Sequence, residues 1–274
     1  MDGHAGETSR ASFPAMCLIL LALDSHPDYS LIVAANRDEF YERPTAPAAF
    51  WPDAPSILAG RDLLAGGTWL GVDRGGRFAA VTNFRQGRRE SAAPRSRGRL
   101  VRDFLASATD PGRYLQGVDS DAAQYNGFNL LVGGPRRLCY FSNREGAPRV
   151  LPPGVYGLSN HLLDTAWPKV VSGKSGLLAL VRKGEAELVE ALLELLADRG
   201  HPPENLLPAT GIGADWDRLL SAAFIASAEY GTRSSTVVLI GHEGNATFVE
   251  QGFLRGGTPT ERRRFEFQVA ETEA

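Results

Sequence analysis

The chain has 274 residues and a mass of 29.5 kDa, enough for one large domain or two small ones. Its composition, 43% hydrophobic and 22% charged, is that of a globular protein and excludes intrinsic disorder, collagen and a coiled coil. The formal net charge of -3 disfavours nucleic acid and anionic membrane surfaces as partners.

The beginning of the chain contains no secretory or membrane-spanning segment. Residues 1–15 are polar and small and have no apolar run, so we predict a disordered extension or a wrongly assigned start. The apolar run 16–23 is too short to cross a bilayer and predicts a buried strand. A second apolar run, 31–35, ends in Asn36-Arg37-Asp38-Glu39, which predicts that charged side chains begin where this strand reaches the surface.

Later strands are predicted in pairs. Turn residues separate the members of two hairpins, and a third pair flanks a turn near the C-terminus. The predicted strands are 68–72 with 78–81, 127–133 with 137–142, 155–158, 234–240 with 246–250, and a last one at 265–269 in the charged tail. An asparagine follows two of these strands, at Asn83 and at Asn160.

The predicted helices lie between the strands. Ser96 is expected to cap a helix that runs to about residue 107, whereas Pro168 and Gly173 are expected to interrupt a mixed helix over 165–182. Residues 185–199 form a clearly amphipathic pattern. Strands at both ends of the chain with helices grouped between them predict an α+β fold of layered antiparallel sheets.

The sequence has no motif for a cofactor or a metal. No glycine-rich phosphate motif follows a strand, and the cysteines and histidines are not spaced as metal ligands, so we expect no cofactor. Two cysteines, Cys17 and Cys139, favour a reducing compartment, and we expect the protein to be cytoplasmic. Cys139 is interpreted as a core residue.

Cys17 is the most informative residue because it directly follows Met16. If Met16 and the residues before it are removed, Cys17 carries an α-amine of pKa about 7.7–8.0 beside a thiol of pKa about 8.5, so base and nucleophile occupy one residue. With residues 1–15 attached, its nitrogen is an amide and cannot act as a base. The alternative is that Cys17 is an apolar core residue, as free cysteines often are.

The charged residues after the second strand are candidate partners of Cys17. If the two leading strands are antiparallel neighbours, Arg37 can favour the thiolate and Asp38 or Glu39 can hold the amine. The alternative is a solvated strand end with a surface ion pair, worth at most about 1 kcal/mol.

Three further polar residues complete the candidate site. Asn83 and Asn160 offer amide donors for an oxyanion, although asparagines after strands are also common turn formers. Arg233 can bind a substrate carboxylate or support the thiolate; alternatively, it is a polar residue at the start of a strand.

Many short motifs occur in order along the chain, from Met16 to about Phe253. They are Met16-Cys17, Ala35-Asn36-Arg37-Asp38-Glu39-Phe40, Gly66-Gly67-Thr68-Trp69-Leu70-Gly71, Val81-Thr82-Asn83-Phe84-Arg85, Tyr125-Asn126-Gly127-Phe128-Asn129-Leu130, Gly157-Leu158-Ser159-Asn160, Trp167-Pro168-Lys169-Val170 and Tyr230-Gly231-Thr232-Arg233-Ser234-Ser235-Thr236. Together they resemble the NRDE family, whose eukaryotic branch is called transport and Golgi organisation protein 2.

This family is similar to N-terminal-nucleophile (Ntn) hydrolases. The resemblance therefore implies a single domain over residues 16–270, folded as a four-layer αββα sandwich of antiparallel sheets. It also implies that Cys17 is the nucleophile, Arg37 its electrostatic partner and Asp38 the carboxylate that orients the amine. Because two residues separate the arginine from the aspartate in the cysteine amidases but the two are adjacent here, Asp38 and Glu39 both stay candidates for that role.

The resemblance assigns the remaining residues and the function less narrowly. Asn160, with Asn83 as a second candidate, is implied for the oxyanion hole, and Arg233 for the distal arginine. The implied function is a cysteine amidohydrolase that cleaves a non-peptide C–N amide bond of a small molecule. The alternative is a non-catalytic protein of the same fold that binds and traffics haem, a lipid or acyl-CoA, since fold does not determine function.

Overall fold

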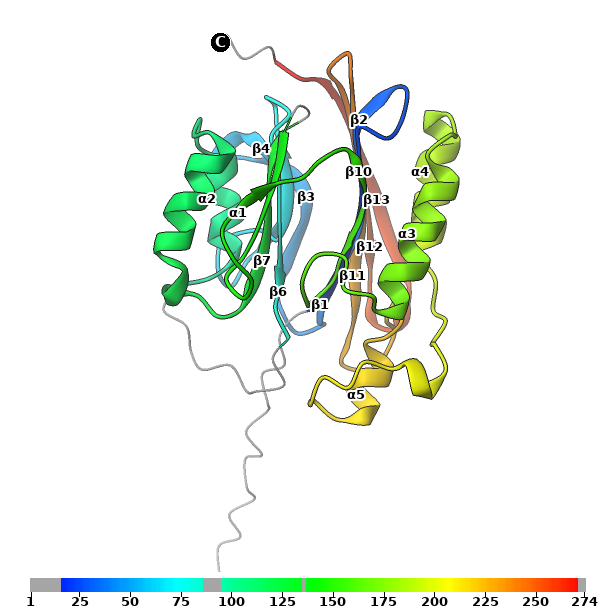
Figure 1. Cartoon of the computed structure of the whole chain (residues 1–274). Coiled ribbons are helices and arrows are strands. Elements are labelled where there is room, and N and C mark those ends of the chain that lie inside the picture. The colour runs from blue at the N-terminus through cyan, green and yellow to red at the C-terminus, as the bar shows by residue number, and fades with distance from the viewer. Residues whose placement is uncertain (1–15, 86–94, 135–136, 271–274) are drawn as a thin grey trace, which may run out of the picture.

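Two antiparallel sheets stack face to face, and a layer of helices covers the outer face of each (Figure 1). The structure is a computed structural model that describes residues 16–85, 95–134 and 137–270. The predicted extension, residues 1–15, lies outside this range. The four-layer αββα arrangement confirms the predicted fold class.

Within the described residues, one sheet has six strands and the other has seven. The six-stranded sheet consists, in spatial order, of β10 (Gly154–Leu158), β1 (Met16–Leu23), β2 (Tyr29–Phe40), β11 (Tyr230–Gly241), β12 (Asn245–Phe253) and β13 (Pro259–Gln268). The seven-stranded sheet consists of β3 (Thr45–Trp51), β4 (Ala54–Asp62), β5 (Leu70–Asp73), β6 (Phe78–Asn83), β7 (Phe128–Gly134), β8 (Arg137–Ser142) and β9 (Arg149–Val150).

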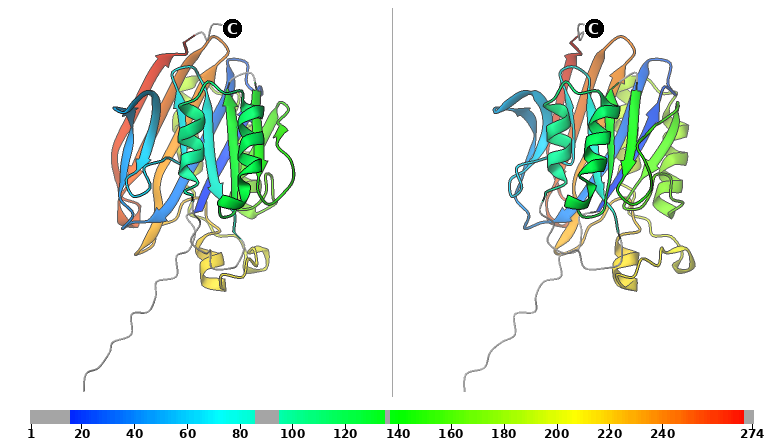
Figure 2. Two further views of the ribbon diagram at one scale, coloured as in Figure 1. Left: turned by 90° about the vertical axis from the view of Figure 1, so that its left-hand side faces the viewer. Right: turned by 60° about the vertical axis from the view of Figure 1, so that its left-hand side comes forward.

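The longer helices are divided between the two outer faces. Figure 2 shows α1 (Gly98–Leu105) and α2 (Pro111–Ser120) in front of the seven-stranded sheet. On the opposite side of the molecule, α3 (Pro168–Leu180) and α4 (Glu185–Leu196) pack on the six-stranded sheet, and α5 (Ala214–Leu219) follows near one end of that sheet (Figure 1). None of the helices in the described ranges is long and apolar enough to cross a membrane.

The alternation of side chains along β1 explains its continuous apolar sequence. Ile19 and Leu21 belong to the core between the two sheets. Leu18 and Leu20 belong to the core beneath α3 and α4. A strand that is buried on both faces needs apolar residues at every position.

Several predicted boundaries were wrong. The second strand does not end before Asn36; β2 runs on to Phe40, because β1 pairs with one side of it and β11 with the other. Its polar residues are therefore buried inside the sheet and not at the surface.

The helix predictions were also partly wrong. Ser96 does not cap α1, whose N-cap is Arg97 without a side-chain cap bond. Pro168 occupies the first turn of α3, where a missing N–H costs little, so this helix is not interrupted. The fourth helix ends at Leu196, three residues earlier than predicted.

Candidate functional site

Cys17 and Arg37 are direct neighbours across two strands. In the antiparallel register of β1 with β2, Cys17 pairs with Arg37 and Met16 pairs with Asp38. This confirms the predicted pairing of the two leading strands. Cross-strand partners have their side chains on the same face of a sheet, and Cys17 and Arg37 both line the same pocket.

The alternation along β2 separates the polar residues that are adjacent in the sequence. Arg37 and Glu39 line the pocket between the sheets. Asn36 points the other way, since its amide donates to the carbonyl oxygen of Leu196 in α4, and Asp38 shares this outer face. Arg37 and Asp38 therefore act on opposite sides of the strand.

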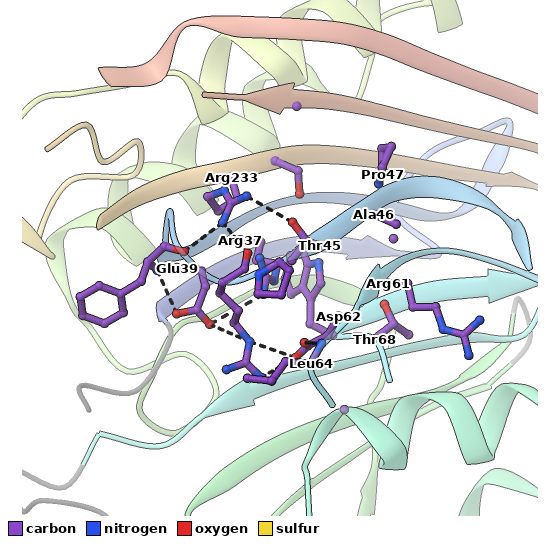
Figure 3. A pocket seen from close by; sticks show the side chains of 18 of the residues that line it. Arg37, Glu39, Thr45, Ala46, Pro47, Arg61, Asp62, Leu64, Thr68 and Arg233 are labelled. Atoms are coloured by element: carbon purple, nitrogen blue, oxygen red, sulfur yellow. Dashed lines mark hydrogen bonds and ion pairs between the residues drawn. The ribbon is translucent and has the colours of Figure 1, made fainter. Parts of the chain in front are cut away.

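The pocket has a volume of about 740 Å³ and opens between the two sheets. Besides Cys17 its lining includes five arginines, namely Arg37, Arg43, Arg61, Arg97 and Arg233, and the acidic residues Glu39, Glu42, Asp62 and Glu250. Figure 3 shows Arg37, Glu39 and Arg233 close together at one side of it. Three of these arginines are paired with carboxylates: Arg37 lies 3.7 Å from Glu39, Arg43 lies 2.6 Å from Asp62, and Arg61 lies 2.6 Å from Asp53. A ligand that carries a carboxylate would compete with these acids for the guanidinium groups.

Three acceptors hold the guanidinium of Arg233. Its Nη1 donates to the carbonyl oxygens of Phe40 (2.9 Å) and Arg43 (3.1 Å), and its Nη2 donates to Thr45 Oγ1 at 3.3 Å. Burial and the neighbouring Arg37 lower the pKa of Arg233. The structure thus brings the predicted distal arginine to the same pocket as Cys17 and fixes its orientation.

Asn160 contacts the nitrogen of Cys17. The backbone N–H of Cys17 donates to Asn160 Oδ1 at 3.1 Å, and Asn160 Nδ2 donates to the carbonyl oxygen of Asn83 at 3.0 Å. The Ser159 hydroxyl donates to the carbonyl oxygen of Cys17 at 2.9 Å. Asn160 is fully buried, whereas Asn83 lines the pocket. Asn160 therefore contacts Cys17 directly, Asn83 lines the same pocket as Cys17, and the role of both as oxyanion donors stays a prediction.

The thiol of Cys17 is difficult to ionise in this form of the chain. Its pKa is raised to about 12: burial is the largest cause and the Asp38 carboxylate also raises it, whereas Arg37 and the backbone N–H of Asp38 lower it. The expected influence of Arg37 is present, but desolvation outweighs it.

The Asp38 carboxylate is fully buried and only half satisfied. Thr232 Oγ1 donates to Oδ1 at 2.7 Å, but Oδ2 has no hydrogen-bond partner among the described residues. Burial raises the pKa of Asp38 to about 6, although Lys169 and the Thr232 hydroxyl lower it. Glu39 is bound differently: its Oε1 accepts from the N–H of Phe40 and its Oε2 lies 3.7 Å from Arg37 Nη2.

Sequence analysis missed two charged groups near the site. Lys169, in the first turn of α3, is buried and lies close enough to influence both Asp38 and Cys17 electrostatically. Glu250 lines the pocket and accepts a hydrogen bond from the N–H of Ala48 at 2.6 Å. The sequence did carry a signal for Lys169. It follows a proline that begins a helix, so it places a cation in the first turn of that helix.

No part of the described chain brings three or more His, Cys, Asp or Glu side chains together as a metal site.

A family model described as "Transport and Golgi organisation 2" matches residues 16–255. The chain belongs to the transport and Golgi organisation 2 family. It is 39% identical over 275 residues to the "Transport and Golgi organization 2 homolog" of Mus musculus, which covers 93% of this chain and 99% of the mouse protein. It is 31% identical over 262 residues to the Drosophila melanogaster "Transport and Golgi organization protein 2", covering 86% of this chain and 92% of the fly protein.

All six residues predicted from the sequence lie within the matched part of this transport and Golgi organisation 2 family member. Among solved structures, a Caenorhabditis elegans N-acylethanolamine-hydrolyzing acid amidase orthologue is similar, with a TM-score of 0.46 and 15% identity, covering 81% of this chain and 92% of that one. A mutant conjugated bile acid hydrolase from Clostridium perfringens has a TM-score of 0.45 and 9% identity, covering 94% of this chain and 93% of that one.

Proposed function

We propose that the protein is an Ntn-type cysteine hydrolase that cleaves a linear, non-peptide amide bond of an anionic small molecule. Cys17 is the nucleophile, and it becomes competent when Met16 and all residues before it are removed. Guanidinium groups that line the pocket bind the acidic group of the substrate. The cytoplasm, which the two cysteines favour, is the proposed location.

One observation carries this proposal: the nitrogen of Cys17, as well as its side chain, lies in the candidate site. The side chain lines the pocket beside Arg37. The nitrogen has its own buried acceptor, Asn160 Oδ1, at 3.1 Å. An amine released at this position would be held next to its own thiol, which is the arrangement that a one-residue nucleophile and base requires.

The proposed reaction has two stages. In the first, the amine takes the proton of the thiol, the sulfur attacks the amide carbonyl carbon, and Asn83 and Asn160 stabilise the oxyanion. The ammonium then returns the proton to the leaving nitrogen, the C–N bond breaks and a thioester remains. In the second stage the amine deprotonates a water molecule, which attacks the thioester and releases the acid and the thiol.

Removal of the residues before Cys17 supplies the general base that the intact chain lacks. With the peptide bond in place, the nitrogen of Cys17 is an amide and burial holds the pKa of the thiol at about 12. A free α-amine has a pKa of about 7.7–8.0, which is suited to a general base at neutral pH.

The test uses a chain that starts at Met16, so that removal of the initiator methionine exposes Cys17, which the intact mass verifies. We would screen acyl and carboxyacyl amides of a fluorogenic amine. Wild type and Cys139→Ala are expected to release the amine, whereas Cys17→Ala loses at least about a hundredfold in rate. Cys139 is the matched control because it is a second buried free cysteine, on β8. Equal hydrolysis by Cys17→Ala would remove Cys17 from the mechanism.

A carrier of haem, a lipid or acyl-CoA is the second candidate. The observation that favours it is the combination of an arginine-rich pocket with a thiol whose burial opposes ionisation. A visible-band titration with haem and a thermal-shift screen with acyl-CoA test this function. Binding that Cys17→Ala leaves unchanged, together with no hydrolysis of any amide, supports carriage.

A further inference from the structure

Three buried charged residues, Asp38, Lys169 and Arg85, come from three different elements. Asp38 lies on the outer face of β2, Lys169 in the first turn of α3, and Arg85 directly after β6 of the other sheet. Lys169 interacts electrostatically with both of the others. In each of them one polar atom, namely Asp38 Oδ2, Lys169 Nζ or Arg85 Nε, has no hydrogen-bond partner among the described residues. Buried polar atoms are normally satisfied, so three such atoms in interacting residues require an explanation.

Met16 connects these residues to the candidate site. It is buried and pairs with Asp38 across the strands. Its backbone N–H donates to the Tyr230 hydroxyl at 2.7 Å, and Arg85 Nη2 lies 3.5 Å from its sulfur. In the proposed function Met16 leaves, and its neighbours Asp38, Tyr230 and Arg85 stay next to the new amine of Cys17. Lys169 acts on this place through its electrostatic interaction with Asp38 and Cys17.

The fold places Lys169 here at an energetic cost. α3 approaches β1 closely, because a Cβ atom at Gly173 would lie 2.8 Å from the side chain of Leu20. Lys169 follows Pro168 in the first turn of the helix, where the helix dipole disfavours a cation. Burial opposes its charge as well and lowers its pKa to about 8, which Asp38 partly offsets. A lysine kept under these conditions indicates a role beyond packing.

We propose that Lys169 is a positioning residue whose ammonium keeps the released amino group of Cys17 in its neutral, proton-accepting form. This inference rests on the proposed function. A cation lowers the pKa of an amine beside it, because the two positive charges repel each other. Enzymes activate lysine amines with a neighbouring cationic group in the same way. Asp38 lies on the same face, and its carboxylate stabilises the cationic form of both amines. It therefore limits how far the pKa of the Cys17 amine falls.

The other charged and titratable groups around this position do not replace Lys169. From β2, Arg37 and Glu39 face the pocket on the opposite side, 3.7 Å apart. Arg85 is paired with Asp217 of α5 at 3.2 Å, so its charge is largely compensated.

Two neutral groups complete the surroundings. Tyr230 of β11 stays neutral because burial raises its pKa well above the ordinary value. Burial and Arg85 lower the pKa of His161, so this imidazole is neutral at pH 7.

The experiment measures the pKa of the amine without any substrate. It uses the chain that starts at Met16 in a Cys17→Ala background, so that no thiol competes, and follows acetylation of the terminal amine against pH by mass spectrometry. The parent amine is expected to titrate below the ordinary range of about 7.7–8.0. Lys169→Met should raise its pKa by about one unit, Lys169→Arg should leave it near the parent value, and Asp38→Asn should lower it.

An unchanged or lower amine pKa in Lys169→Met, or a parent amine within the ordinary range, would overturn the inference. If Lys169→Met does not fold, Lys169→Gln, which removes the charge but keeps a polar end group, takes its place, and an amine pKa in Lys169→Gln equal to that of the parent overturns the inference. Failure of the proposed function shows up separately, as equal hydrolysis by wild type and Cys17→Ala, because the amine titration does not depend on turnover.

Discussion

At the scale of single residues, the thiol of Cys17 is governed by its surroundings more than by its nearest cation. Arg37 is its direct cross-strand partner, yet burial and Asp38 together hold its pKa at about 12. The thiolate needed for catalysis therefore does not form at neutral pH until the environment of the strand end changes. This makes the processing step at residue 16 central to the proposed chemistry.

The pH dependence of alkylation follows from this pKa. In the full chain carrying Cys139→Ala, alkylation of Cys17 by iodoacetamide should accelerate about tenfold per pH unit from pH 7 to 10, because the thiolate fraction rises up to a pKa of about 12. Asp38→Asn should speed the reaction at a given pH, since the carboxylate raises the thiol pKa, and Arg37→Gln should slow it. Mass spectrometry measures the rates. A plateau near pH 9 in wild type would contradict the prediction.

At the scale of elements, β2 organises the site. It pairs with β1 on one side and with β11 on the other, so its polar segment is enclosed by backbone hydrogen bonds along both edges. Its twofold periodicity then directs Arg37 and Glu39 into the pocket and Asp38 to the outer face. A strand that ended at Ala35 would leave these side chains in solvent.

The packing of α1 on the seven-stranded sheet depends on Gly71 of β5. A Cβ atom there would lie 3.1 Å from Cδ1 of Leu105 in α1 and also 2.8 Å from Cβ of Ala59 in the neighbouring strand β4, so Gly71→Ala should destabilise the protein by about 1–3 kcal/mol. Gly117, inside α2, is the matched control because nothing lies within 4 Å of its Cβ position. Gly117→Ala should stabilise by up to about 1 kcal/mol. Urea unfolding measures both, and equal effects would contradict the packing argument.

At the scale of the whole molecule, polar contacts join the two sheets near the site. Asn160, which follows β10, donates to the carbonyl oxygen of Asn83 at the end of β6. Glu250 of β12 accepts from the N–H of Ala48 in β3. The pocket lies between the sheets, so these contacts maintain its walls.

Glu250 tests the contribution of such a contact. It is buried, and burial raises its pKa, although the Ala48 N–H and Arg37 lower it. Glu250→Ala leaves a buried N–H without its acceptor and should cost about 1–3 kcal/mol in unfolding free energy, whereas Glu250→Gln keeps an acceptor and should cost less. Glu190, exposed and paired with Arg262, is the control, and its alanine variant should change stability by less than about 0.5 kcal/mol. Equal losses for the two Glu250 variants in urea unfolding would contradict this role.

The sequence by itself determined the layered antiparallel fold and the leading strand at 16–23, because apolar periodicity is a local signal, and it supplied Cys17 as the candidate nucleophile, because a cysteine after a methionine is one too. It also supplied Arg37, Asn83, Asn160 and Arg233 as candidates. Only the tertiary structure decided that β2 continues through the charged segment, since one of its two pairing strands, β11, lies about two hundred residues away in the sequence. It alone placed Asp38 within electrostatic range of the distant Lys169 and showed that burial opposes ionisation of Cys17, because desolvation depends on what the whole fold packs around a group.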